Sequence, residues 1–265
     1  MADILKINEN IHRVTLPYKD IFTTVYTLNT PQGAILFDAG SFDSDLEAYI
    51  LPLLEAAGIS AGHLRFVFIS HNHKDHSGGL SRLLEAFPEV RIVTHSVMLR
   101  EKYGAERCLC PEDGEQILDT FRMVSIPGHT ADSAALLDIR TNTLITGDCL
   151  QQYGILGSGD WASNIPFPAV HRAALAKVRE LEIDQVLTAH DYVPYGYRAD
   201  SNESARQMLD ACEAPLHRLA ALILDNPALD DAQIREIFND PHRPLSINVH
   251  VVAAMRAALE EGTWK

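Results

Sequence analysis

The chain has 265 residues, enough for one large α/β domain or for one domain with an appendage. Its 46% hydrophobic and 22% charged residues are typical of a soluble globular protein. The 22 Lys and Arg residues against 36 Asp and Glu residues give a formal net charge of −14, which disfavours nucleic-acid partners because such a surface repels phosphate backbones.

The N-terminal residues contain neither a basic stretch nor a long apolar core, and no other stretch is long and apolar enough to span a membrane. We therefore expect no signal peptide, no membrane partner and a cytoplasmic location.

The cysteines are few, and only Cys108 and Cys110 lie close together. A redox or metal role for this pair stays open, but reduced residues without a special role are favoured.

Alternating apolar residues predict strands in the first part of the chain, at 4–7, 11–16, 25–28 and 34–37. The turns between them fall at 8–10 and 29–33, where Asn, Pro and Gly gather. Residues 44–57 carry apolar side chains at helical spacing and end at Gly58, which predicts a helix. Residues 103–114 read as a loop that holds the Cys pair.

Four side chains that can ligate a metal fall within six residues, directly after the apolar run Phe66–Ile69. They are His71, His73, Asp75 and His76. On an extended backbone, His71 and His73 project to the same side, because side chains repeat every two residues. Asp75 and His76 lie on the turn before a helix that begins near Leu80. Unliganded, so many polar groups at a strand end would be costly to bury, so the stretch predicts a metal site.

The motif His-x-His-x-Asp-His resembles the signature of the metallo-β-lactamase superfamily. The family pattern has three further ligands, and each has a counterpart here in the same order. His129 follows the apolar stretch 121–126, Asp148 follows the strand predicted at 143–146, and His190 follows the apolar run 186–189.

The resemblance implies an α/β fold, the αββα four-layer sandwich, with a C-terminal helical extension. It also implies two divalent metal ions, most simply Zn²⁺, with Fe or Mn as alternatives. The first ion would take His71, His73 and His129, the second would take Asp75, His76 and His190, and Asp148 would bridge the two. With an Asp at the bridging position, the site resembles the glyoxalase II and lactonase branches of the family.

Two residues beside these ligands have more than one interpretation. Asp38 resembles a family residue that orients a metal ligand from behind, although a turn-forming Asp would read the same way. Cys149 follows Asp148, where a thiolate would be a further metal ligand, but adjacent strand residues face opposite ways, which favours a core position for this thiol.

Residues 150–161 have no clear period and predict a long loop between two ligands, of the kind that is commonly functional. Helices are predicted over 168–180, 204–224, 230–238 and 247–259. In the first of these helices we expect Val170 on the apolar face and His171 exposed to solvent. We expect a metal-binding domain over residues 1–198 and a helical extension over 199–265 that caps the cleft and can form a homodimer contact.

The resemblance implies hydrolysis of a small-molecule substrate with an activated carbonyl, a thioester, an ester or a lactone, by a hydroxide held between the two ions. Asp75 would steer the nucleophile and pass its proton to the leaving group. Tyr153 would assist at the carbonyl, as a tyrosine does in lactonases. Trp161, Tyr192 and Tyr195 would line an apolar pocket, or else serve in packing. Residues 151–161 contain no Lys or Arg, which argues against glutathione specificity.

Two other functions stay open. In the sulfur dioxygenase branch, which keeps the whole motif, His71, His129 and Asp148 would hold a single iron. Alternatively, the metals would serve a weakly active regulatory protein. Phosphodiester cleavage is a further variant, which the acidic composition disfavours.

Overall fold

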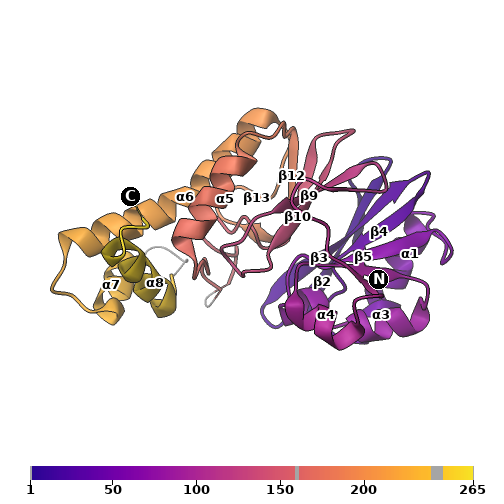
Figure 1. The fold of residues 1–265 in the computed structure, drawn as a ribbon, viewed down its shortest axis with the longest axis horizontal. Coiled ribbons are helices and arrows are strands. Elements are labelled where there is room, and N and C mark those ends of the chain that lie inside the picture. The colour runs from indigo at the N-terminus through magenta and orange to yellow at the C-terminus, as the bar shows by residue number, and fades with distance from the viewer. Residues whose placement is uncertain (1, 159–160, 240–246, 265) are drawn as a thin grey trace. The chain divides into compact units, whose positions relative to one another are not determined.

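The computed structural model describes residues 2–158, 161–239 and 247–264. Two mixed β-sheets with helices give the α/β class that the sequence predicts (Figure 1). The chain divides into two compact units, Met1–Val124 with Ala134–Arg140, and Ser125–Ser133 with Thr141–Lys265. The boundary expected at residue 198 stays a prediction.

The seven-stranded sheet lies within the first unit, and its strands are adjacent in chain order. They are β1 (Ile4–Lys6), β2 (Ile11–Tyr18), β3 (Ile21–Thr30), β4 (Gly33–Phe37), β5 (Leu64–Phe68), β6 (Arg91–Val93) and β7 (Cys108–Leu109). Pairing is antiparallel from β1 to β4 and parallel from β4 to β7. The prediction of a loop over 103–114 is wrong at β7, because this short strand completes the parallel edge of the sheet.

Helices of the first unit cover one face of this sheet. They are α1 (Leu51–Ala56), α2 (Lys74–Ser77), α3 (Leu80–Ala86) and α4 (Val97–Tyr103). A π-helical segment, η1 (Leu46–Ile50), precedes α1, and the Leu51 N–H donates to the Leu46 carbonyl. The wider turn fits the sequence, since Pro52 has no N–H to donate to the preceding turn. Strand residues such as Leu36 and Val67 pack with Leu53 and Leu83 in the core.

The six-stranded sheet has the order β13-β12-β11-β10-β9-β8. Its strands are β8 (Gln116–Ile117), β9 (Phe121–Ser125), β10 (Ala134–Asp138), β11 (Thr143–Ile145), β12 (Gln185–Tyr192) and β13 (Gly196–Ala199). β11 and β12 pair in parallel, so their carboxyl ends lie at the same edge. This edge carries two of the side chains that the sequence singles out, Asp148 after β11 and His190 near the end of β12.

The second unit contains α5 (Pro168–Val178) and three C-terminal helices, α6 (Asn202–Asp225), α7 (Asp231–Phe238) and α8 (Val249–Glu260), which confirms the predicted helices. Reciprocal capping boxes start α6 at Ser201 and α7 at Asp230. The three helices share a core around Leu219, Ile234 and Val251. Their role as a cap over a cleft stays a prediction.

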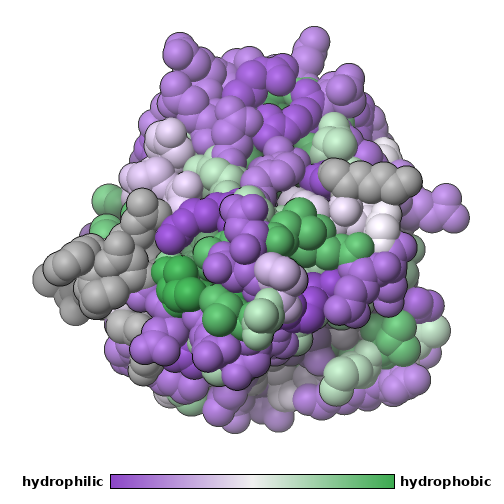
Figure 2. Space-filling model, turned by 90° about the vertical axis from the view of Figure 1, so that its left-hand side faces the viewer, coloured by the Kyte–Doolittle hydropathy of each residue, from purple (hydrophilic) through white to green (hydrophobic). Residues whose placement is uncertain are grey.

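The surface on the side of the molecule where α7 and α8 lie is mostly hydrophilic, with patches of hydrophobic side chains (Figure 2). No helix in the described part of the chain combines the length and the apolar character needed to cross a bilayer. Three of the four cysteines, Cys108, Cys149 and Cys212, are buried and Cys110 is exposed, and all four are free thiols.

Candidate metal centre

The first set of potential ligands lies in one short stretch after β5. The Nε2 atom of His71 lies 3.0 Å from Nδ1 of His73, and the His71 and His76 rings are 4.2 Å apart. An Asp75 carboxylate oxygen lies 3.3 Å from Nε2 of His76. His71, Asp75 and His76 are buried and His73 is exposed. Four donors therefore lie close together because the bend after β5 leads to the first two and the first turn of α2 carries the others.

Asp38 supports this set from behind, at the end of β4. Its carboxylate accepts hydrogen bonds from the Ser70 N–H at 2.8 Å, the Ser70 hydroxyl at 3.0 Å and Nδ1 of His76 at 2.7 Å. A hydrogen bond at Nδ1 leaves Nε2 as the nitrogen that can ligate a metal. Burial raises the pKa of the Asp38 carboxyl, against the opposing effects of His76 and Ser70.

Two glycines let α2 and α3 approach the loop after β4. A Cβ atom at Gly78 would clash with the Ser41 carbonyl, and one at Gly79 would clash with the Ala39 carbonyl. Close backbone contact of this kind requires glycine. The Gly-Gly pair after the motif therefore fixes the four donors against the strand end that carries Asp38.

The second set comes from three separate segments, and its first member is His129, after Gly128. Nδ1 of His129 lies 2.7 Å from the Asn164 carbonyl oxygen and 2.9 Å from Nε2 of Gln151. The Gln151 side-chain oxygen in turn accepts the Asn164 N–H at 2.6 Å. This arrangement directs Nε2 of His129 away from the loop, 3.6 Å from Asp148 Oδ2. The sequence gives no sign of Gln151 and Asn164 as partners, because neither lies in a recognisable motif.

Asp148 and His190 complete the second set. Gly147 has a φ of 54°, a left-handed conformation that turns the chain after β11 and immediately before Asp148. Nε2 of His190 lies 3.2 Å from Asp148 Oδ1, and the Tyr192 hydroxyl donates to the same oxygen at 2.9 Å. Asp148 is thus flanked by His129 at one oxygen and by His190 and Tyr192 at the other.

His171 on α5 is fully buried, so the expectation that it is solvent-exposed is wrong. The buried face of α5 includes His171, Ala174 and Val178, whereas Val170 is 49% exposed. A Cβ atom at Gly128 would clash with the His171 side chain, so the two residues are in direct contact. Burial lowers the pKa of His171 to about 4, which keeps the ring neutral at neutral pH.

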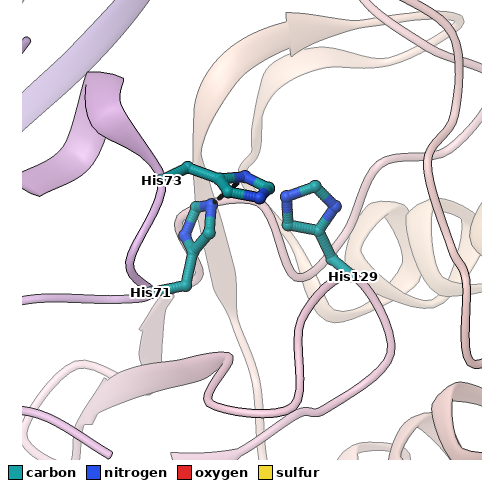
Figure 3. A group of neighbouring side chains, drawn as sticks. All are labelled: His71, His73 and His129. Atoms are coloured by element: carbon teal, nitrogen blue, oxygen red, sulfur yellow. Dashed lines mark hydrogen bonds between the residues drawn. The ribbon is translucent and has the colours of Figure 1, made fainter. Parts of the chain in front are cut away.

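All seven residues that the sequence proposes as ligands fall into three groups of possible metal donors (Figure 3 shows the first). The groups are His71, His73 and His129; His71, His76 and Asp148; and Asp75, His76 and His190. Within each group, the donor atoms lie within 4.8 Å of one another. Imidazole nitrogens and carboxylate oxygens fit zinc, iron or manganese. The donor set is therefore that of a metal centre, and the number and identity of the ions stay predictions.

The residues expected to contact substrate are placed as follows. Tyr192 is 1% exposed and bonded to Asp148, so it does not offer an open pocket wall. Tyr195 is 41% exposed. Tyr153 and Trp161 are half-buried, and their backbone N–H groups donate to the Val193 carbonyl and the Ser158 hydroxyl. Contact of any of these residues with substrate stays a prediction.

An aromatic and cationic surface borders the first ligand set within the first unit. The Phe42 ring lies 6.3 Å from the Tyr18 ring, and the Lys74 ammonium lies 4.8 Å from the Phe42 centroid. Burial and the Asp75 charge raise the pKa of Tyr18, which places this phenol within electrostatic reach of a proposed ligand. Phe42 and Met98 are 42% and 68% exposed.

The chain is similar to several known proteins. The family model of the metallo-beta-lactamase superfamily matches residues 18–214. A Beta-lactamase-like protein 2 homolog from Caenorhabditis elegans is 28% identical over 174 residues, 63% of this chain and 55% of its own. Thioesterase pkgB from Emericella nidulans is 29% identical over 147 residues, 52% of this chain and 37% of its own. The chain thus spans about half or less of these curated relatives.

Solved structures share the fold at low sequence identity. A metallo-beta-lactamase from Pontibacter korlensis superposes with a TM-score of 0.61 at 18% identity, over 81% of this chain and 98% of its own. The chemotaxis sensor ODP, solved as a peroxy diiron species, gives a TM-score of 0.59 at 17% identity, over 80% of this chain and 94% of its own. At these identities the likeness establishes the architecture alone.

Proposed function

Since the chain belongs to the metallo-beta-lactamase superfamily, we propose that it is a metal-dependent hydrolase of small molecules with an activated carbonyl. Thioesters are the first substrate class to test, followed by esters and lactones. The observation that carries the proposal is the convergence of seven His and Asp side chains in three overlapping donor groups.

We assign His71, His73 and His129 to one ion, Asp75, His76 and His190 to a second, and Asp148 to both. Two of the three donor groups described above have the same members as these two ion sites, and the third group contains Asp148. When bound, two divalent ions would supply an activated water and a Lewis acid for the carbonyl oxygen.

Asp75 is the proposed general acid–base residue. It is 8% exposed, and its Oδ2 atom lies 3.3 Å from Nε2 of His76. A carboxylate with one oxygen on a metal keeps a second oxygen that can hold the proton of the attacking water. Asp75 would then deliver this proton to the leaving group, which departs as a neutral thiol or alcohol.

The names of two relatives favour thioesters among the carbonyl substrates, and the surface beside the first ligand set suits an acyl substrate. One relative is named a thioesterase, and a second, from the same fungus and 26% identical, is named an atrochrysone carboxyl ACP thioesterase. The exposed Phe42 and Met98 side chains suit an acyl chain, and the Lys74 ammonium suits an anionic group on the substrate.

The test is a hydrolysis panel with protein reconstituted separately with zinc, iron and manganese. The panel contains acyl-coenzyme A, an acyl-N-acetylcysteamine thioester, an aryl ester and a lactone. We expect hydrolysis that is lost with a chelator and restored by metal, with a thioester as the best substrate. A metal-binding protein with no metal-dependent rate on any compound would contradict the proposal.

Elemental analysis separates the alternatives. Two ions per chain with hydrolysis supports the proposal, whereas one iron per chain with oxygen uptake on a persulfide substrate supports a sulfur dioxygenase. A homodimer, a cytoplasmic location and the absence of nucleic-acid and membrane partners stay predictions from the sequence.

A further inference from the structure

We propose that Tyr192 is a positioning residue for the Asp148 carboxylate, and that its hydroxyl determines how this carboxylate is shared between two metal ions. The inference rests on the proposed role of Asp148 as a shared ligand. It replaces the expectation that Tyr192 contacts substrate with a role behind the metals.

The strand places Tyr192 where it can act in this way. Tyr192 follows His190 by two residues on β12, and side chains two apart on a strand project to the same side. The two rings meet edge to face, with centroids 5.8 Å apart and planes at 88°. Tyr192 is 1% exposed, so the hydrogen bond from its hydroxyl to Asp148 is shielded from solvent.

The two oxygens of Asp148 face different histidines. Oδ1 lies 3.2 Å from His190 Nε2, and Oδ2 lies 3.6 Å from His129 Nε2. These histidines belong to the two different proposed ion sites. With its plane in this orientation, the carboxylate would offer one oxygen to each of the two proposed ion sites.

The Tyr192 hydroxyl holds that plane. It donates to Oδ1 at 2.9 Å, on the His190 side. An Oδ atom has two lone pairs, so this bond leaves one for a metal. The distance of 2.9 Å is that of a well-formed hydrogen bond, and both residues are buried. A metal bound at His190 Nε2 would replace Oδ1 as the partner of this nitrogen, whereas the tyrosine hydroxyl would keep its contact with Oδ1.

The experiment compares Tyr192→Phe with Tyr195→Phe. Tyr195 comes from the same segment but is 41% exposed, and its backbone N–H contacts Gln152 instead of a proposed ligand. Zinc affinity is measured by competition with a coloured chelator, and zinc content by elemental analysis after dialysis. We expect Tyr192→Phe to weaken the weaker zinc-binding step by about 10- to 100-fold, the usual effect of losing a partner of a metal ligand. Tyr195→Phe should stay within about twofold of the wild type.

A double-mutant cycle with Asp148→Asn tests whether the tyrosine acts through Asp148. In the Asp148→Asn background, Tyr192→Phe should have almost no further effect on zinc affinity. Circular dichroism of the zinc-free variants checks that the fold is kept, and a phenylalanine at 192 removes only one heavy atom.

Three outcomes of these zinc measurements would contradict the inference. Wild-type affinity for both zinc ions in Tyr192→Phe overturns the inference, as does an undiminished effect in the Asp148→Asn background. Full zinc content in Asp148→Ala would overturn both the inference and the ligand assignment. Failure of the hydrolysis panel alone would leave the zinc measurements intact, so the positioning role and the proposed activity are judged separately.

Discussion

The two ligand sets are built in different ways. The first, from His71 to His76, occupies six consecutive residues, and one strand end and one helical turn give it its shape. The second, His129, Asp148 and His190, comes from three segments and is held by side chains far away in the sequence. A compact set is encoded locally, whereas a dispersed set depends on its hydrogen-bonded supports. Variants in each set can break or sharpen this contrast.

Removal of a ligand from either set should have the largest effect. His71→Ala and Asp148→Ala should each lose bound metal, and hydrolysis should fall by about 10³-fold, as expected when an electrostatic catalytic group is removed. Elemental analysis and the panel rates measure this loss, and the cores of both units should keep the fold. His63→Ala is the control, because His63 contacts Asn29 and the Thr30 carbonyl rather than a ligand. Full metal content in either ligand variant would show that the assignment is wrong.

His171 is a buried residue beside the dispersed set, because its side chain contacts Gly128, which precedes His129. Its pKa is about 4 in the folded protein and near 6.5 when exposed, so the unfolded chain takes up a proton that the folded protein does not. The stability contributed by the neutral ring is therefore complete above pH 6.5 and falls as the pH drops toward 4. In metal-free protein, the unfolding free energy of the wild type should drop by about 3 kcal/mol more than that of His171→Gln over this range.

Urea unfolding at several pH values gives this difference directly. Since the remaining histidines titrate in both proteins, their contribution cancels in the comparison. Parallel curves for the two proteins would mean that His171 is not held neutral by burial.

Asp38 tests the compact set. It lies outside the six residues that carry the ligands and supports them through its contact with His76. Asp38→Asn keeps the shape and tolerates the φ of 65° at this position, but it replaces one of the two oxygens that accept from Ser70 and His76 with an NH2 group. Metal affinity should fall by about 10-fold, at the lower end of the range for partners of metal ligands. The matched control is Asp45→Asn, a buried carboxylate that accepts the Ser41 and Phe42 N–H groups. An equal loss in both variants would mean that the effect of Asp38 is structural.

His250 should give the smallest effect. Its Nε2 atom lies 2.6 Å from Asn164 Oδ1, which links α8 to the residue whose carbonyl contacts His129. The side chain is exposed and acts on the ligand only through Asn164, so His250→Ala should change metal affinity by less than about threefold. His217→Ala, beside Trp264, is the control. A tenfold loss would show that the C-terminal helices belong to the support of the dispersed set.

The same contrast explains how much the sequence predicts. The strand before His71, the order of the other ligands and the C-terminal helices follow from local patterns, and the structure has these elements. The supports Gln151, Asn164 and Tyr192 could not be assigned, because a hydrogen bond between residues far apart leaves no local signal. His171 was misplaced because the apolar residues of α5 allow two helix faces that differ by one position, and contact with Gly128 selects the face that includes His171.

The distribution of the cysteines has a practical consequence. Burial raises the pKa of the Cys212 thiol to about 12 and also raises that of Cys108, so at neutral pH these thiols stay protonated and unreactive. Cys149 is 1% exposed, whereas Cys110 is exposed. A maleimide dye or a nitroxide should therefore attach at Cys110 alone, which gives a single reporter on native protein without engineering a new attachment point.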